Sequence, residues 1–347
     1  MAGKSMAGKK AVSYSQAGVD VKKVKSMHAD LWAQIAGTFS LTKGKYGEAV
    51  ELFGHYGGLF KAENGRLLVI HTDGVGSKVL LAQQMQKFDT VGIDAIAMSA
   101  NDILCLGARP LVAVDYLALS KNDGELVSQV TRGLVEGAKQ ALCPIIGGET
   151  AILPDIIKGE SRPFDLAVTI VGEVHESRLI TGAKMKEGDA LVGLASSGLH
   201  SNGYTLARKI LDAQKWGNEM LIPTRIYVQC VLEMLQNAQI HGIAHITGGA
   251  FSKLMRIGEY AKVGFLLDNM PPPAPVFLEL AKSVNSEYEM HRTFNMGIGL
   301  VLACPKEEAQ KLIEISKKHK IDACIIGKVT QKQDVILKKG AQEISLL

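Results

Sequence analysis

Strand-like and helix-like apolar patterns alternate along residues 66–174 of this 347-residue chain. Apolar runs bounded by Gly, Asp or Pro are typical of strands, whereas apolar residues that recur three or four apart indicate amphipathic helices. Strands are therefore expected at residues 66–72, 109–119, 144–147 and 164–174, and helices at 91–106 and from a cap at Asn122 or Asp123 onward. Strands that alternate with helices predict a domain in which helices cover a sheet.

The pattern changes at the polar turn of residues 182–189, where a second unit begins. Strands are expected there at residues 190–195, 263–268, 297–303, 323–329 and 335–338, and helices at 202–214, 225–239, 252–261 and 306–318. The sequence thus predicts an α+β protein of two mixed α/β domains, at residues 14–180 and 181–347. The Lys-containing repeat in MAGKSMAGKK has no apolar face to bury, so residues 1–13 are expected to form a flexible tail.

Composition narrows the class of protein. An apolar fraction of 47% with 21% charged residues is normal for a globular protein in water. The formal net charge of +4 comes largely from lysines near the N-terminus, without the basic and aromatic pattern of a nucleic-acid groove. The five cysteines include no C-x-x-C pair, which is typical of reduced thiols, and no apolar run reaches 18 residues. We expect a cytoplasmic protein without nucleic-acid or membrane partners.

The stretch TDGVGSK, residues 72–78, ends the first predicted strand with an aspartate and two glycines. It resembles a phosphate loop, but the P-loop of nucleotide-binding enzymes requires G-x-x-x-x-G-K-[ST]. Here the last two residues are reversed, and His71 stands where the first Gly is needed. The motif therefore fails as a P-loop, and the carboxylate of Asp73 needs another explanation.

Carboxylates recur in short segments of small residues. Asp73 follows a strand, Asn101 and Asp102 lie within a strongly apolar helix, and Glu149 follows two glycines. Asp73 alone is also explained by a simple Asp-Gly turn, and Glu149 by an exposed loop. A carboxylate in an apolar helix, however, must be paired or must bind a cation. Because Mg²⁺ prefers oxygen ligands and is usually shared with phosphates, these acids predict a Mg²⁺ and nucleotide site in which Lys78 meets the phosphate.

The segment SSGLHSNGY, residues 196–204, joins a polar loop to a predicted helix. Free N–H groups at a helix N-terminus near Ser201 or Asn202 would favour an anion. His200 at the tip of the loop is a candidate acid or base near neutral pH. The simpler alternative is a capped helix with a surface histidine.

Two further histidines give weaker signals. His245 precedes Ile-Thr-Gly-Gly and either lines the same cleft or caps a turn. His71 lies within a strand and is interpreted as a packed residue.

Seven segments in order resemble aminoimidazole ribonucleotide synthetase, also called phosphoribosylformylglycinamidine cyclo-ligase. They are YSQAGVD (14–20), TDGVGSK (72–78), GIDAIAMSANDILCLGARPL (92–111), GGETA (147–151), SSGLHSNGY (196–204), HITGG (245–249) and EMHRTFNMGIG (289–299). The resemblance covers nearly the whole chain from Tyr14 onward. It implies a homodimer in which two N-terminal sheets pair into a barrel, with ATP and Mg²⁺ as requirements.

The implied reaction is the ATP-driven closure of phosphoribosylformylglycinamidine to 5-aminoimidazole ribonucleotide, with release of ADP and phosphate. An amide oxygen is a poor leaving group, so its phosphorylation lets phosphate depart as the amidine nitrogen attacks. Transfer of a phosphoryl group requires charge neutralisation and alignment more than covalent help from the protein.

The resemblance and the segments above assign candidate roles to individual residues. The predicted metal ligands are Asp73, Asp102 and Glu149, and the predicted catalytic residues are His200, Lys78 and Asp102. Predicted ATP contacts are Gly57, Gly58, Asp73, Gly74, Gly76, Ser77, Lys78, Asn101, Gly148 and Thr150. Predicted substrate contacts are Ser196, Ser197, His200, Ser201, Asn202, His245 and Asn295.

The chain departs from the family pattern after His245, where Ala250 replaces a third Gly and only Arg256 keeps an approximately matching place. Two alternatives stay open. One is another ATP-using member of the superfamily, similar to phosphoribosylformylglycinamidine synthase. The other is a nucleotide-binding scaffold without catalysis.

Overall fold

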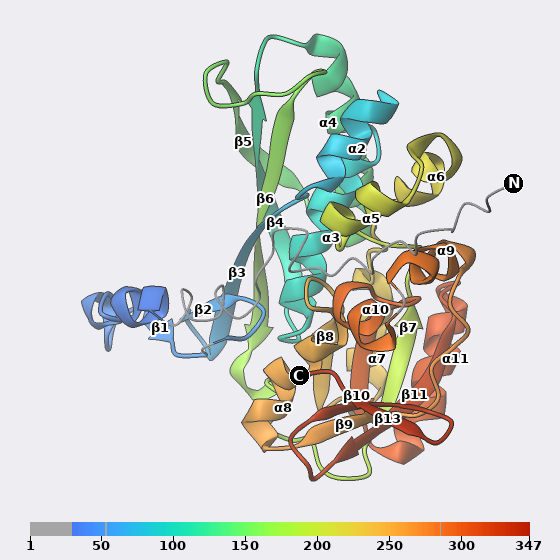
Figure 1. Ribbon diagram of the computed structural model, residues 1–347. Coiled ribbons are helices and arrows are strands. Elements are labelled where there is room, and N and C mark those ends of the chain that lie inside the picture. Colours follow the sequence, from blue (N-terminus) through green and yellow to red (C-terminus); the bar gives the residue numbers. More distant parts are fainter. Residues whose placement is uncertain (1–29, 53, 285) are drawn as a thin grey trace, which may run out of the picture.

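The computed structural model describes residues 30–52, 54–284 and 286–347. Its first sheet has six strands in the order β1-β2-β3-β6-β4-β5, of which only the β4–β5 pair is parallel. The strands are β1 (Ala49–Val50), β2 (Gly58–Lys61), β3 (Arg66–Gly74), β4 (Arg109–Leu119), β5 (Ile145–Ile152) and β6 (Phe164–His175). The helices α2 (Lys78–Met85), α3 (Val91–Leu104) and α4 (Gly124–Ala141) lie on one side of this sheet (Figure 1).

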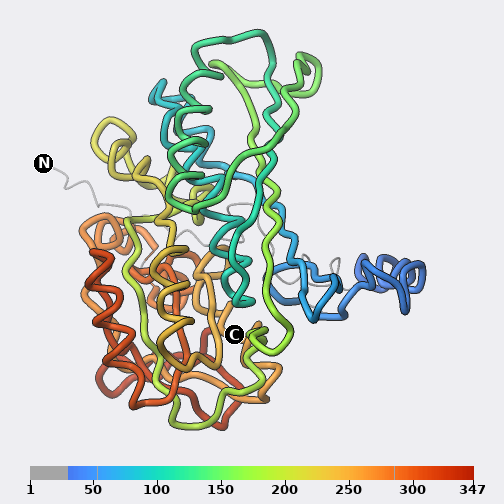
Figure 2. Tube along the Cα trace, turned by 180° about the vertical axis from the view of Figure 1, so that it is seen from behind, coloured from blue at the N-terminus to red at the C-terminus, as the bar shows by residue number. Residues whose placement is uncertain are grey.

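The two faces of the first sheet differ because side chains alternate along each strand. Residues 164, 166, 168, 170, 172 and 174 of β6 are buried beneath the helices, whereas the intervening residues are partly or fully exposed. The helices also pack closely on each other: a Cβ on Gly92 of α3 would lie 2.2 Å from the backbone N of Leu134 in α4. The opposite face of the sheet has no helical cover within the described chain (Figure 2).

The second sheet has seven strands in the order β13-β12-β9-β11-β7-β10-β8, and only its β12–β9 pair is parallel. The strands are β7 (Ala190–Ala195), β8 (Gly242–His245), β9 (Gly264–Leu267), β10 (Ile298–Cys304), β11 (Ala323–Thr330), β12 (Val335–Lys339) and β13 (Gln342–Ser345). Its helices are α5 (Tyr204–Ile210), α6 (Ala213–Met220), α7 (Val228–Asn237), α8 (Met255–Ala261), α9 (Pro275–Val284), α10 (Glu287–Thr293) and α11 (Ala309–Lys318). The described residues also form a helical segment at 30–36 and the 3₁₀ helices η1 (Phe39–Thr42), η2 (Glu176–Arg178), η3 (Ala250–Leu254) and η4 (Lys306–Glu308).

The structure confirms the α+β fold with two mixed sheets, and neither sheet closes on itself among the residues that the structure describes. The first sheet spans residues 49–175 and the second 190–345, so the predicted boundary at residue 180 lies between them. The predicted strands 109–119 and 190–195 match β4 and β7. The tail at residues 1–13 and the YSQAGVD segment lie outside the described residues.

Among the elements that differ from the sequence prediction, three carry candidate site residues. The helix expected at 202–214 is two helices, because the chain turns at Leu211 and the side chain of Asp212 caps a new helix by accepting from Gln214 N. The strand expected at 144–147 continues to Ile152, so Glu149 lies in a strand. The HITGG segment follows strand β8, which the sequence analysis does not predict. No described helix has the length and apolarity needed to cross a membrane.

Candidate active site

Asp102, near the C-terminal end of α3, lies between two histidines from different sheets. Its Oδ1 is 2.6 Å from Nδ1 of His245 at the end of β8, and its Oδ2 is 3.3 Å from Nε2 of His71 on β3. The structure thus brings Asp102 and His245 together from segments 143 residues apart. The interpretation of His71 as a packed residue needs correction, because its ring reaches the same carboxylate.

The surroundings of Asp102 keep it ionised. Burial alone would raise the pKa of its carboxyl group, but the hydrogen bond and charge of His245, together with His71, hold that pKa below its usual value. An ionised Oδ1 accepts the Nδ1–H of His245. In the neutral tautomer that this contact selects, the other ring nitrogen, Nε2, is the hydrogen-bond acceptor, and it lies 3.5 Å from Nδ2 of Asn101. This arrangement fixes the tautomer and orientation of His245, as an orienting carboxylate does for a general base.

Asp73 lies beside this cluster, two residues after His71 on the same face of β3. Its Oδ1 accepts from the backbone N of Gly74 at 2.8 Å. Burial, and then the negative charge of Asp102, raise the pKa of Asp73, while His71 opposes the shift. Two neighbouring carboxylates, one of which raises the proton affinity of the other, form a negative centre suited to a cation.

We expect Asp73→Asn to stabilise the fold while it removes a predicted metal ligand. Folding raises the pKa of Asp73, so this acid costs folding free energy at pH values above its unfolded-state pKa, and pH 7 lies in that range. The variant should melt a few degrees above the parent at pH 7. Asp165→Asn is the matched control, because Asp165 Oδ1 also accepts from the next backbone N but is exposed. A melting temperature equal to or below that of the control would contradict the prediction.

Glu149 does not lie with Asp73 and Asp102 within one chain. It is exposed and pairs in register with Tyr116, which lies on the uncovered face of the sheet. Its neighbour Gly148 faces the other way, because a Cβ there would meet Asp115 Oδ1 at 2.4 Å. The predicted three-carboxylate site therefore differs from the structure, since alternation along β5 turns Glu149 away from the helices. Thr150 is exposed on the same edge strand.

No group of three or more His, Cys, Asp or Glu side chains among residues 30–52, 54–284 and 286–347 is arranged to hold a metal ion. Two carboxylates nevertheless fit Mg²⁺, which keeps several waters and takes other ligands from substrate phosphates. Asp73 and Asp102 are the residues present for that role.

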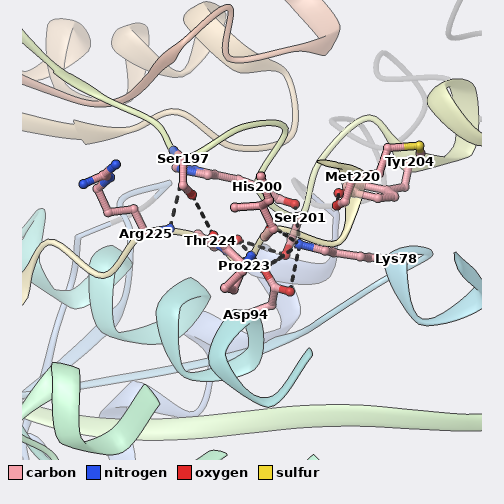
Figure 3. A network of polar contacts seen from close by, with 11 residues as sticks. Lys78, Asp94, Ser197, His200, Ser201, Tyr204, Met220, Pro223, Thr224 and Arg225 are labelled. Atoms are coloured by element: carbon pink, nitrogen blue, oxygen red, sulfur yellow. Dashed lines mark hydrogen bonds and ion pairs between the residues drawn. The ribbon is translucent and has the colours of Figure 1, made fainter. Parts of the chain in front are cut away.

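Lys78, predicted to contact phosphate, is instead fully buried (Figure 3). Its ammonium group donates to Asp94 Oδ1 at 3.0 Å and to the carbonyls of His200 at 3.1 Å and Ile222 at 2.8 Å. These three contacts use the three N–H donors of a lysine. Burial lowers the pKa of Lys78, and Asp94 opposes that shift. We therefore correct its assignment: Lys78 positions the 196–204 loop and does not contact ATP in this arrangement.

Asp94, in the first turn of α3, is the other centre of this network. Its Oδ1 accepts from Ser201 Oγ at 2.9 Å, from Thr224 N at 2.7 Å and from Thr224 Oγ1 at 2.6 Å. Asp94 and Lys78 come from the first domain, whereas Ser201 and Thr224 come from the second (Figure 3). The buried pair thus fixes the two domains against each other.

His200 is buried and not at an exposed loop tip. Its Nε2 accepts from the backbone N of Ser197 at 3.1 Å and of Arg225 at 3.5 Å. Burial, followed by His245 and nearby cations, lowers the pKa of His200 well below its usual value, so the ring is neutral. Nδ1 then carries the proton and has no hydrogen-bond partner among the described residues. Any proton donation to a ligand from this ring would use Nδ1.

Neighbouring polar groups hold the same loop. Ser196 Oγ lies 3.1 Å from Asn295 Oδ1, and Asn295 Nδ2 donates to Gly198 O at 2.9 Å. Ser197 Oγ donates to Pro223 O at 2.6 Å. Asn202 Nδ2 is buried and has no partner among the described residues, which leaves it as the polar group of this loop most available to a substrate.

Asn101 also positions protein rather than contacting a cofactor. Its Nδ2 donates to Arg225 O at 2.8 Å, and its Oδ1 accepts from Tyr227 N at 3.0 Å. The amide therefore fastens α3 to the segment that precedes α7. These hydrogen bonds explain why Asn101, a polar residue, lies in the apolar helix α3.

The predicted phosphate-contacting backbone consists of Gly57, Gly58, Gly74, Gly76 and Ser77, at β2, the end of β3 and the start of α2. Gly76 has φ of +70° and open space where a Cβ would stand, so its backbone is accessible to a ligand. Tyr56, next to Gly57, donates its hydroxyl to His245 O at 3.4 Å. The glycine-rich loop thus borders the Asp102 cluster.

Lys253 in η3 is a charged neighbour of the cluster that the sequence analysis does not identify. Burial and then Arg256 lower its pKa to about 8, while Asp102 and Asp73 oppose the shift. Lys253 lies four residues after Gly249 in the short 3₁₀ helix η3, where no periodic pattern of apolar residues predicts the direction of its side chain. His71, by contrast, shares a strand face with Asp73, and that spacing is a usable signal.

The two mixed sheets with their covering helices define a class of two-domain α+β proteins. A solved structure described as "AaThiL complexed with AMPPCP and TMP" shares the fold, with a TM-score of 0.65 at 16% identity over 95% of this chain and 99% of that chain. The family model "AIR synthase related protein, N-terminal domain" matches residues 54–174, and its C-terminal counterpart matches residues 186–340. The chain belongs to the AIR synthase related protein family.

Curated relatives extend the similarity over most of the chain. A protein of Thermococcus kodakarensis is 43% identical over 92% of this chain and 95% of its own length. One from Methanocaldococcus jannaschii is 45% identical over 93% of this chain and 94% of its own length. Both are named phosphoribosylformylglycinamidine cyclo-ligase.

Proposed function

We propose that the chain catalyses the ATP-dependent cyclisation of phosphoribosylformylglycinamidine to 5-aminoimidazole ribonucleotide in purine biosynthesis. The observation that carries this proposal is the Asp73–Asp102 carboxylate pair beside an oriented His245, in a chain about 43% identical to named cyclo-ligases. ATP as cosubstrate is supported by the AMPPCP-bound structure of the same fold, because AMPPCP is an analogue of ATP.

The residues present suit each step of this reaction. Asp73 and Asp102 would hold Mg²⁺, which would neutralise charge on the triphosphate. The γ-phosphoryl group passes to the formyl amide oxygen, and the amidine nitrogen then attacks the activated carbon as the C–O bond breaks and phosphate leaves. Ring closure releases one proton, and His245 Nε2 is the group oriented to accept it. Asn202 and the Nδ1–H of His200 are the unpartnered groups that would orient the substrate.

The test is ADP release measured with synthetic phosphoribosylformylglycinamidine, with the arylamine product measured in parallel by diazo coupling. ADP and arylamine should form in equal amounts, and only when ATP, Mg²⁺ and substrate are all present. ADP release that depends instead on ammonia and the preceding amide substrate would indicate a synthase-like activity. Nucleotide binding without any substrate-dependent ADP would indicate a scaffold.

The proposed homodimer would pair the uncovered faces of two first sheets, as the family resemblance implies. Ile70, Val114, Tyr116 and Ile146 on these strands are 42%, 39%, 43% and 65% exposed, which is high for large apolar side chains in a sheet. A second copy would bury them and could close the two open sheets into a barrel. A cytoplasmic location is consistent with four buried free cysteines and one half-buried one among the described residues.

We expect Val114→Glu/Tyr116→Glu to convert the dimer to a monomer, because four like charges would meet across the interface. Sedimentation equilibrium should give half the mass of the parent protein. Val135→Glu/Leu278→Glu is the control, since these side chains are 44% and 53% exposed on helices away from this face. A parent protein that is already monomeric would contradict the proposed assembly.

A further inference from the structure

A cavity of about 800 Å³ opens where the first sheet meets the segment leading to the second. Its lining comes from the starts of β3 and β4, from residues 173–184, from α7 and from the residues around the start of β8. None of the residues of the Asp102 cluster lines it. Arg66 and His71 are five residues apart on β3, so the cavity and the cluster are separated by roughly 16 Å along that strand.

One wall of this cavity is strongly basic. Its charged lining consists of Arg66, Arg109, Arg178, Lys184 and Glu173. Four cations against one carboxylate leave a formal charge of +3 with the histidines neutral. Neither Arg178 nor Lys184 forms an ion pair with any residue that the structure describes. Such a concave basic wall favours a small anion with more than one negative charge.

Glu173 holds two of the arginines in place. Its Oε2 is 2.6 Å from Nη1 of Arg66, and its Oε1 is 2.9 Å from Nη2 of Arg109. Each guanidinium group keeps further N–H donors for a ligand, because arginine has five. Two fixed arginines lose little side-chain entropy on binding, which favours bidentate recognition of a phosphate.

The lining also includes apolar side chains. Leu179 and Ile180 come from the segment after η2, and Leu232 and Leu235 come from α7. His241 closes one end and is itself held by Asp189, with Nδ1 2.6 Å from Oδ2. The volume lies in the range of about 300–1,000 Å³ that is usual for small-molecule sites. A ligand with a flat apolar ring and a phosphate would match both kinds of lining residue.

We propose that this cavity is a second ligand site that binds a nucleoside 5′-phosphate, with the phosphate on Arg66, Arg109, Arg178 and Lys184 and the base against the leucines. The site is separate from the reaction proposed above and does not depend on it. It gives the protein a way to bind a nucleotide without occupying the ATP site.

The test is calorimetric titration of the full chain with adenosine 5′-monophosphate, adenosine and inorganic phosphate. We expect the monophosphate to bind, phosphate to compete with it, and adenosine to bind at least 10-fold more weakly. Arg178→Ala/Lys184→Ala should weaken the binding of the monophosphate at least 10-fold. The turnover of this variant with ATP should stay within twofold of that of the parent. Lys121→Ala/Arg132→Ala removes the same charge elsewhere and should change binding less than twofold.

Asp73→Asn/Asp102→Asn separates this site from the ATP site, because it alters the cluster and leaves the cavity intact. The monophosphate should bind this variant as it binds the parent. Binding that is lost in this variant, or unchanged in Arg178→Ala/Lys184→Ala, would place the ligand elsewhere and overturn the proposal. The proposal would also be overturned if adenosine bound as tightly as adenosine 5′-monophosphate, or if the monophosphate did not bind at millimolar concentration.

Discussion

Asp102→Asn should lower kcat/KM for the cyclisation by about 10³-fold, within the range known for lost acid–base function. The amide keeps the shape of the side chain and can still accept from His245 Nδ1 at Oδ1. It loses the negative charge that the proposed Mg²⁺ site requires, and it presents N–H donors where Oδ2 faces His71 at 3.3 Å. Steady-state ADP release with saturating Mg²⁺ measures the effect. Turnover within 10-fold of the parent would contradict the role of Asp102.

Asp189→Asn is a close control for this experiment. Asp189 holds His241 at 2.6 Å in the second domain, which is the same separation as that between Asp102 and His245. Both variants weaken one buried carboxylate–histidine pair, so their unfolding transitions should shift by similar amounts. Only Asp102→Asn should lose turnover per folded molecule. Equal loss in both variants would indicate a general effect of stability.

The fold was largely predictable because its long elements carry clear local periodicity. Strands β4 and β7 match their predicted ranges since their apolar runs end at turns or charged residues. The split between α5 and α6 was not predictable from apolar spacing, which continues through Leu211. The side chain of Asp212 caps the second helix by a local hydrogen bond, and this hydrogen bond causes the split. The spacing of apolar residues contains no sign of it.

The site was predictable in its residue types and less so in its geometry. Acids in apolar surroundings correctly indicated that Asp102 has partners, and His245 is one of them. The sequence does not show which face of a strand an acid takes, so Glu149 was grouped with acids that lie on the other face. The sequence also does not distinguish a lysine that binds phosphate from a buried lysine that pairs with a carboxylate. Lys78 is of the second kind, because it pairs with Asp94, 16 positions away.

Lys78→Met should lower the free energy of unfolding by about 3–5 kcal/mol, because it leaves the carboxylate of Asp94 buried without its counter-ion. Methionine has a similar length, so the cavity stays filled and the lost interaction is mainly electrostatic. Urea unfolding of the parent and the variant at pH 7 measures the difference. The control is Lys87→Met, because Lys87 is exposed. It should lower the free energy of unfolding by less than about 0.5 kcal/mol.

The double variant Lys78→Met/Asp94→Asn distinguishes a charge effect from lost packing. Asparagine keeps an oxygen for Ser201 and Thr224 and removes the unpaired charge, so part of the lost stability should return. If the double variant is less stable than Lys78→Met, the network acts through the hydrogen bonds of Asp94 and not through the ion pair. Because the same network holds the His200 carbonyl, Lys78→Met should also raise KM for the open-chain substrate, whereas Lys87→Met should leave it unchanged.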